Sequence, residues 1–328
     1  MGRTITRTPI RTRNGVPILL LVAAVSYGYA AVPGDFHYLY TFGSKQGIHP
    51  PRLLNRRAVI GALGAAEHPY GLAHPIAVAT DMRHRVWITD GTTASVHVFD
   101  PASGAYREIK RAGDVPLQQP WGIVADAAGR IYVVDSGTGG IYVFDENGEY
   151  DRSLFRRDEH PLQAPTVIAL SEDGRTIYVA DPPRNVVVAF NREGEVDLTL
   201  SLPEEMREPT AISVINNQLY VLGSRQHRVE IFSPTGRPLG DLRWDGVLFP
   251  TAFAFDPAQR RFLVANPKWS IVQTFTEEGL NTASFGHLGE GVDQTMRIDS
   301  LHVDPRGLVY VVDTLDGKVV VFSETETH

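Results

Sequence analysis

The chain has 328 residues, of which 31 are Lys or Arg and 38 are Asp or Glu, and it contains no cysteine. This composition, with 43% apolar residues, excludes intrinsic disorder, a collagen-like fibre, a disulfide scaffold and a thiolate zinc site. The formal net charge of −7 lacks the basic excess that binding to a phosphate backbone requires, so no nucleic-acid partner is expected.

Residues 1–30 predict an export signal. They contain four arginines and no acid, and an apolar run follows from Val16 to Ala31, which is the order of regions in a secretory signal peptide. The small residues Gly28 and Ala30 favour cleavage after Ala30, which would change the net charge from −7 to −11. The run is shorter than the roughly 20 residues of a spanning helix. We therefore expect a secreted or periplasmic protein. An uncleaved segment that tethers the protein to the membrane, facing outside the cytoplasm, is the alternative.

Residues 31–74 form an N-terminal segment in which we expect two elements. The sequence YLYTFG predicts a strand at about residues 37–43, because it is rich in aromatic residues and ends at a glycine. Residues 51–60 predict a short helix with proline in its first turn that ends near Gly61 or Gly64. We interpret this helix as a lid over the edge of the main domain rather than as a partner-binding helix.

Residues 75–328 contain six copies of one pattern. The copies begin at Pro75, Pro120, Pro165, Pro209, Pro250 and Ile298, at intervals of 45, 45, 44, 41 and 48 residues. Each copy has a large apolar residue, a polar or Gly residue three positions later, and a phenylalanine nine positions after that. These triplets are Trp87, Asp90 and Phe99; Tyr132, Asp135 and Phe144; Tyr178, Asp181 and Phe190; Tyr220, Gly223 and Phe232; Leu263, Asn266 and Phe275; and Tyr310, Asp313 and Phe322. A repeat of this length indicates a propeller or a solenoid.

Each copy predicts a four-stranded antiparallel sheet. Short β-branched and aromatic runs, such as residues 131–134, are typical of strands, and their successive apolar residues indicate burial on both faces. Only six residues follow Phe322, which is too few for a last strand, whereas residues 38–43 resemble the fourth strand of the fifth copy, residues 283–286. We therefore predict an all-β, six-bladed β-propeller whose ring is closed by an N-terminal strand in the last blade.

The pattern resembles the NHL repeat. The resemblance covers residues 75–323 and is clearest in residues 120–148, where PWGIVADAAGRIYVVD is followed by GIYVFDENG. Together with the leader, the chain is similar to exported NHL-repeat propellers of bacteria. The resemblance implies a six-bladed ring and, for this broad family, mostly binding roles, but it implies no particular ligand.

One face of the ring is the expected binding surface. The loops before the first strand of each blade and the turns between the second and third strands emerge on the same face, and loops on rigid scaffolds often hold binding residues. The candidate ligand-binding residues on this rim are Trp121, Arg184, His227, Lys268, Trp269 and Asp299. An ordinary solvated loop surface is the alternative interpretation. No catalytic residue, metal ligand or cofactor is predicted.

The repeated aspartates predict turns rather than a metal site. Asp90, Asp135, Asp181 and Asp313 occupy the same position in different copies, so they form a ring and do not meet at one point. Their carboxylates are expected to accept backbone N–H groups at strand ends. We expect the same of the other repeated turn aspartates, which are Asp81, Asp126 and Asp304. Histidines that match no repeat position, His302 among them, are expected on the surface or in loops.

Two related propeller enzymes define the catalytic alternative. Propellers of the amidating-lyase type place zinc-binding histidines just after the first proline of several blades. In this chain those positions hold Ile76, Trp121, Thr166, Thr210, Thr251 and Asp299, so the three-nitrogen site is absent. Gluconolactonase-type propellers hold a divalent cation with Glu, Asn and Asp. The corresponding residue types here are Glu208, Asn266 and Asp299, and the sequence does not show that they converge.

These observations favour an exported, non-enzymatic binding or scaffold propeller that presents one face to a protein, peptide or glycan partner. The alternative is a metal-dependent hydrolase or lyase with Ca or Zn in the central channel.

Overall fold

The computed structural model describes residues 10–11, 17–18, 36–43, 72–155, 162–206, 208–223, 228–289 and 293–324. The predicted signal segment lies largely, and the predicted helix at residues 51–60 entirely, outside these ranges. Within residues 1–30, the short strands β1 (Ile10–Arg11) and β2 (Pro17–Ile18) pair with each other. Among the described residues no helix is long and apolar enough to cross a membrane.

The described chain forms six four-stranded antiparallel sheets, which we number as blades in chain order. Blade 1 contains β4 (Pro75–Thr80), β5 (Val86–Asp90), β6 (Ser95–Phe99) and β7 (Tyr106–Ile109). Blade 2 contains β10 (Pro120–Ala125), β11 (Ile131–Asp135), β12 (Gly140–Phe144) and β13 (Tyr150–Ser153). Blade 3 contains β14 (Ile168–Leu170), β15 (Ile177–Asp181), β16 (Val186–Phe190) and β17 (Val196–Ser201).

The second half of the ring repeats this order. Blade 4 contains β18 (Pro209–Ile215), β19 (Gln218–Gly223), β20 (Val229–Phe232) and β21 (Pro238–Leu242). Blade 5 contains β22 (Phe253–Asp256), β23 (Arg261–Asn266), β24 (Ile271–Thr276) and β25 (Asn281–Phe285). Blade 6 contains β26 (Ile298–Val303), β27 (Val309–Asp313), β28 (Lys318–Glu324) and β3 (Phe36–Gly43). Outside the blades, a hairpin joins β8 (Arg111–Ala112) to β9 (Val115–Pro116), and a 3₁₀ turn, η1, spans Pro182–Arg184.

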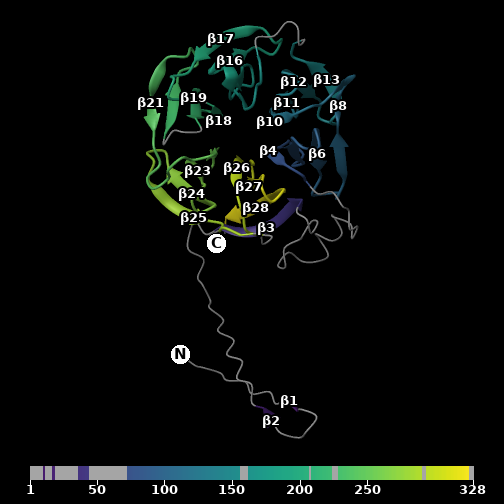
Figure 1. The fold of residues 1–328 in the computed structure, drawn as a ribbon, viewed down its shortest axis with the longest axis vertical. Helices are drawn as coiled ribbons and strands as arrows, with labels where there is room; N and C mark the ends of the chain where they lie inside the picture. The colour runs from purple at the N-terminus through teal and green to yellow at the C-terminus, as the bar shows by residue number, and fades with distance from the viewer. Residues whose placement is uncertain are drawn as a thin grey trace.

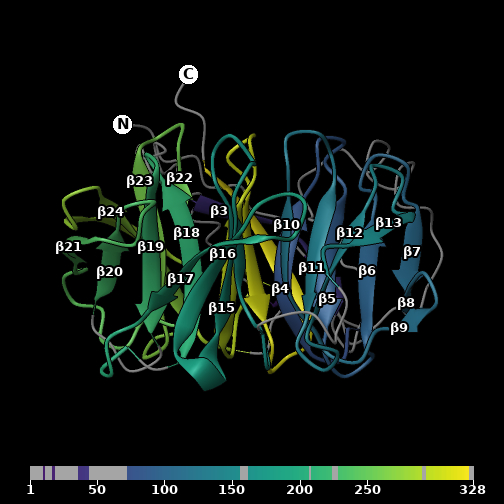
Figure 2. The same cartoon turned by 90° about the horizontal axis from the view of Figure 1, so that it is seen from above.

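The first strands of the six blades surround a central axis, and the fourth strands form the outer rim (Figure 1). Successive first strands contact one another around the full circle, including β26 with β4. Figure 2 shows the blades from the side, with loops above and below the ring. The six-bladed propeller predicted from the repeat is confirmed.

The ring is closed by pairing of the first long strand with the last. β3 runs antiparallel to β28, from Gly43 opposite Lys318 to Phe36 opposite Glu324. The ring of Phe36 stacks on Phe285 of blade 5 with centroids 4.0 Å apart, and Phe42 packs against Phe99 of blade 1 at 4.9 Å. The closing strand therefore seals blade 6 against both of its neighbours, as the sequence predicts.

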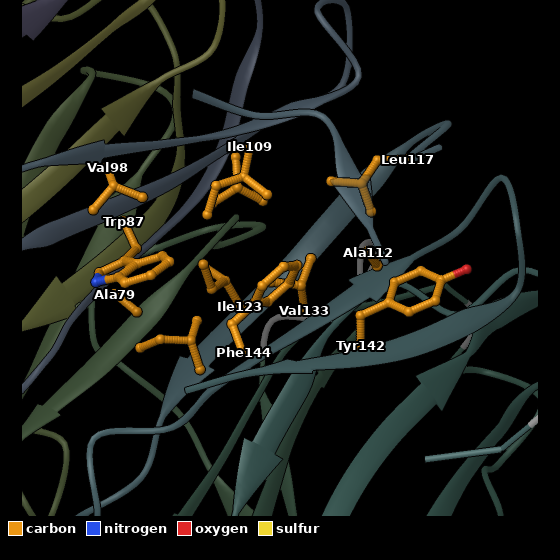
Figure 3. Close-up of a cluster of buried hydrophobic side chains, with 12 residues drawn as sticks. Ala79, Trp87, Val98, Ile109, Ala112, Leu117, Ile123, Val133, Tyr142 and Phe144 are labelled. Carbon is orange, nitrogen blue, oxygen red and sulfur yellow. The ribbon is translucent and has the colours of Figure 1, made fainter. Parts of the chain in front are cut away.

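The core lies between the blades. Side chains from β5 and β6 meet side chains from β11 and β12 in one buried cluster, and each of the other five pairs of neighbouring blades shares a cluster of the same kind. In the cluster between blades 1 and 2, Trp87 faces Ile123 and Phe144 (Figure 3). The next residues along β5, Val86 and Ile88, point to blade 6 instead. This alternation explains why the strands are apolar at successive positions.

Candidate functional site

The two faces of the ring differ in the turns that form them. We call upper the face that carries the loops before each first strand and the turns between second and third strands. We call lower the opposite face, which carries the other turns. On the upper face, fully buried Asp135 accepts N–H groups of Gln118 and Gln119 at 2.7 and 3.0 Å, and of Gly137 and Thr138 at 3.0 Å each. One carboxylate thus fixes the entering loop to the turn beside it.

The same arrangement recurs in three other blades, where Asp90, Asp181 and Asp313 each accept backbone N–H groups of the entering loop. Burial raises the pKa of Asp313, whereas its backbone hydrogen bonds oppose that shift. The turn role predicted for these aspartates is confirmed. In these four blades the end of the entering loop is therefore held in place by buried hydrogen bonds.

Exposed apolar side chains gather on the upper-face loops of the last blades. Five large ones, which we call the upper patch, are Leu248 (57% exposed), Phe249 (48%), Trp269 (56%), Leu288 (60%) and Leu315 (65%). They lie in loops that precede or belong to blades 5 and 6. On the turns of the lower face, the exposed large apolar residues among those described are Met82 and Leu280. Among the described residues, more of the exposed large apolar side chains of the turns therefore lie on the upper face than on the lower face.

Hydrogen bonds join the loops that carry most of this patch. Ser270, next to Trp269, accepts a bond from Thr295 Oγ1 at 2.9 Å through its carbonyl, and its hydroxyl donates to the carbonyl of Met296 at 2.8 Å. The N–H of Met296 then donates to Asp313 at 2.6 Å, at the base of the turn that holds Leu315. These contacts link the turn of blade 5, the loop into blade 6 and the turn of blade 6 into one unit.

A cation lies over the exposed indole of the patch. Lys268 Nζ is 4.8 Å from the ring centroid of Trp269, within the range of a cation–π interaction. The pair combines a flat apolar surface with a positive charge that remains exposed to solvent.

The central channel forms a cavity of about 670 Å³ between the six first strands. Its walls consist largely of small apolar residues, such as Ala77, Ala169, Ala211 and Ala254. Polar groups also line it, among them Thr210, Asp299 and His302.

His302 was expected on the surface or in a loop, and this expectation is wrong. It lies on β26 and lines the cavity, where its Nε2 is 2.8 Å from Thr80 Oγ1 of blade 1. Burial lowers the pKa of His302 to about 4, against the opposing charge of Asp304, so the imidazole is neutral at pH 7. The other blades have Ala, Val or Ser at this position, namely Ala79, Val124, Ala169, Ser213 and Ala254. A large polar residue in a series of small residues was the sequence feature from which the unusual place of His302 could have been predicted.

Residues 117–144, which include β10, β11 and β12, match the model of the NHL repeat. The protein is a six-bladed β-propeller with an NHL repeat. No curated protein matches the chain by sequence.

Solved structures with a similar fold include three structures of lyases. A catalytically inactive virginiamycin B lyase from Staphylococcus aureus with quinupristin is 14% identical and has a TM-score of 0.58, with 79% of this chain and 83% of that chain covered. A streptogramin B lyase is 14% identical and has a TM-score of 0.58, with 79% of this chain and 96% of that chain covered. Selenomethionine-substituted virginiamycin B lyase from Staphylococcus aureus is 11% identical and has a TM-score of 0.58, with 78% of this chain and 97% of that chain covered. At these identities the similarity shows the propeller fold alone.

The propeller spreads the predicted site residues over its upper rim. Lys268 and Trp269 contact each other, and Asp299 lines the cavity, where Arg297 Nε donates to its carboxylate at 2.9 Å and Thr314 Oγ1 also donates to it. The carbonyl of Trp121 accepts a bond of 2.6 Å from Thr89 Oγ1 of blade 1.

The two remaining predicted residues are Arg184 and His227. Arg184 is exposed at the end of η1, with its guanidinium 3.9 Å from Asp181. His227 lies outside the described residues. That all six residues serve one ligand stays a prediction.

Residues considered for a metal site have other partners. Asn266 donates to Gln273 Oε1 at 2.7 Å and accepts the N–H of Lys268 at 3.2 Å, which is a variant of the turn role of the aspartates. Within the ranges that the structure describes, no three His, Asp or Glu side chains are grouped so that they could hold a metal ion.

Proposed function

We propose that this protein is an exported binding propeller that holds a partner polypeptide on its upper patch. The observation that carries the proposal is the exposure of five large apolar side chains on the upper-face loops of blades 5 and 6, with Lys268 over the ring of Trp269. Clusters of exposed apolar residues on soluble proteins mark interaction sites, and tryptophan is enriched among the residues that dominate binding energy.

The backbone around the patch supports a display role. Phe249 has a φ of +55° and directly precedes Pro250, although a bulky residue before proline strongly prefers an extended conformation. A strained residue of this kind persists only when the surrounding structure holds it, and such residues cluster at functional sites. In this conformation the side chain of Phe249 is half exposed on the upper face.

The charge of the patch indicates the chemistry of the partner. Lys268 is exposed and stands beside apolar side chains. A complementary segment would therefore combine apolar residues with an acidic group, because opposite charges favour encounter and set the register of a complex.

Selection from a random peptide library displayed on phage tests this function. Selected peptides should be rich in apolar and acidic residues, and Trp269→Ala should weaken their binding to the full chain by about tenfold or more. Met82→Ala on the lower face, which removes a residue of similar exposure, should leave the affinity unchanged. Failure to enrich any sequence, or equal affinity of Trp269→Ala and the unaltered chain, would contradict the proposal.

A metal measurement separates this function from a metal-dependent hydrolase or lyase. We expect purified protein to contain no stoichiometric Ca or Zn, and its melting temperature to be the same with Ca and with a chelator. Stoichiometric metal that is lost together with stability would favour the enzyme instead.

The cellular location is a separate part of the proposal. Expression in a bacterium with an outer membrane should release a periplasmic protein whose N-terminus, determined by sequencing, is Ala31. Recovery of intact residues 1–30 in the membrane fraction would instead identify a tethered protein.

A further inference from the structure

Two buried hydroxyl groups without a hydrogen-bond partner lie at the upper ends of neighbouring first strands, and one of them belongs to a residue that lines the central cavity. Thr210 Oγ1 is buried without a hydrogen bond, and Thr210 lines the cavity. Thr166 Oγ1, at the equivalent position of the neighbouring blade, is also buried without a hydrogen bond. Buried polar groups in native proteins are nearly always satisfied, so two orphan hydroxyls in adjacent blades call for a specific explanation.

In several blades the pairing between the first and second strands is irregular at the second residue of the first strand. The register between β18 and β19 shifts between Pro209 and Ala211, and that between β26 and β27 shifts between Ile298 and Ser300. Thr210 and Asp299 are therefore the extra, unpaired residues of their strands. Bulges of this type redirect side chains and are frequent next to functional sites.

The carboxylate at this level is fixed in place. Asp299 accepts hydrogen bonds from Arg297 Nε and from Thr314 Oγ1 of its own blade. Thr251 Oγ1 donates to the carbonyl of Ile298 at 2.6 Å, which ties blade 5 to the strand that carries Asp299. The two lining polar residues, Thr210 on β18 and Asp299 on β26, are thus positioned by strands of the ring.

The rest of the cavity wall consists largely of small apolar residues, but charged groups also line it, among them Asp126, Glu172 and Arg192. Gly122 lines it beside blade 3, and a methyl group added at Gly122 would lie 2.4 Å from the carbonyl oxygen of Thr166. The volume of about 670 Å³ lies within the range of roughly 300–1,000 Å³ that is typical of small-ligand pockets.

We propose that the mouth of the central cavity binds a neutral sugar or the end of a neutral glycan. Hydroxyl groups both donate and accept hydrogen bonds, so sugar hydroxyls match the two lining residues Thr210 and Asp299 in kind. The fixed carboxylate of Asp299 disfavours an anion, and a purely apolar ligand would leave the threonine hydroxyl unsatisfied. This site is separate from the upper patch and does not depend on its role.

Calorimetric titration of the full chain tests the site. The probes are glucose, galactose, mannose and N-acetylglucosamine, with glucuronate and inorganic phosphate as charged comparators. We expect at least one neutral sugar to bind with a Kd of about 1 mM or tighter, and the anions to bind more weakly. Absence of binding by all four neutral sugars would overturn the proposal.

Substitutions then locate the binding. Thr210→Val keeps the shape of the side chain but removes the orphan hydroxyl, so it should weaken sugar binding about tenfold without lowering the melting temperature. Trp269→Ala on the upper patch is the control and should leave sugar affinity unchanged. Unchanged affinity in Thr210→Val, or loss of binding in Trp269→Ala, would assign the sugar to another site.

Chain length distinguishes the two sources of the ligand. A trisaccharide of the preferred sugar that binds more tightly than the monosaccharide identifies the end of a glycan, and equal affinities identify a free sugar. If the trisaccharide does not compete with the monosaccharide for binding, the two ligands occupy different sites. This result would overturn the proposal that both bind at the mouth of the cavity.

Discussion

The indole Nε1 of Trp87 donates a hydrogen bond of 2.8 Å to Oδ2 of Asp81. Asp81 lies in the turn before the strand of Trp87, and it also accepts the backbone N–H and the Nε of Arg85. Tyr132 and Tyr310 reach the equivalent turn aspartates, Asp126 and Asp304, at 3.3 and 3.4 Å. In these three blades the aromatic residue therefore has two roles, since its ring fills the space between blades and its polar atom holds a lower-face turn.

Removal of this polar atom should destabilise blade 1. Trp87→Phe leaves a buried carboxylate with one donor fewer and also removes part of a fully buried side chain, so we expect a loss of about 2 kcal/mol in the free energy of unfolding. Tyr132→Phe breaks a longer bond and should cost about 1 kcal/mol. Urea denaturation measures both values. A loss in Tyr132→Phe that equals or exceeds the loss in Trp87→Phe would contradict this account.

The upper-face aspartates lead to a second prediction. Asp135→Ala removes the acceptor of four backbone N–H groups and should cost about 3 kcal/mol or more. Asp135→Asn keeps one acceptor oxygen and should cost about 1 kcal/mol, because blade 5 uses Asn266 at the same position. Thermal unfolding followed by circular dichroism distinguishes the two variants. Equal losses would show that the carboxylate does not act through these hydrogen bonds.

Closure of the ring should depend on β3. Deletion of residues 36–43 exposes the edge of β28, so we expect a sharply lower melting temperature or aggregation. A synthetic peptide with the sequence of residues 36–43 should restore part of the lost stability when it is added to the truncated protein, and a scrambled peptide should not. A thermal transition unchanged by the deletion would refute closure by this strand.

His302 should make the propeller sensitive to acid. The pKa of His302 is lowered from 6.5 to about 4 by burial, so between these pH values the unfolded chain binds a proton that the folded chain does not. The stability is therefore complete above pH 6.5 and declines as the pH falls toward 4, by up to about 3 kcal/mol.

His302→Gln removes the titrating group and retains a polar side chain at the cavity wall. The difference in unfolding free energy between pH 7 and pH 4.5, measured by urea denaturation, should become smaller in this variant. If the unfolding free energy depends on pH identically in both proteins, His302 does not contribute to the loss of stability at low pH.

The sequence predicts the blades well because their determinants are local and repeated. The spacing of Trp87, Asp90 and Phe99 recurs in every copy, and each member occupies the same place in each blade. The closing strand is predictable for the same reason, since residues 38–43 imitate a neighbouring fourth strand. These features need no knowledge of contacts between distant residues.

The site was less predictable because it depends on such contacts. The bond between His302 and Thr80 joins residues 222 positions apart, and no local pattern encodes it. The bulges at Thr210 and Asp299 could not be predicted from the alternation of apolar and polar residues along a strand, because that alternation assumes regular pairing. Exposure of Leu288 and Leu315 depends on how neighbouring loops pack, whereas Trp269 was recognisable as an aromatic residue in a turn.

The pairing of β3 with β28 also affects how the protein is made. A nascent chain leaving the ribosome presents the aromatic strand β3 early, but its partner at residues 318–324 emerges only after the five intervening blades. During that interval the strand has an unsatisfied edge, which invites association with other chains. We therefore expect ring closure to be the last step of maturation, and chaperones that shield extended apolar segments to raise the yield of the protein.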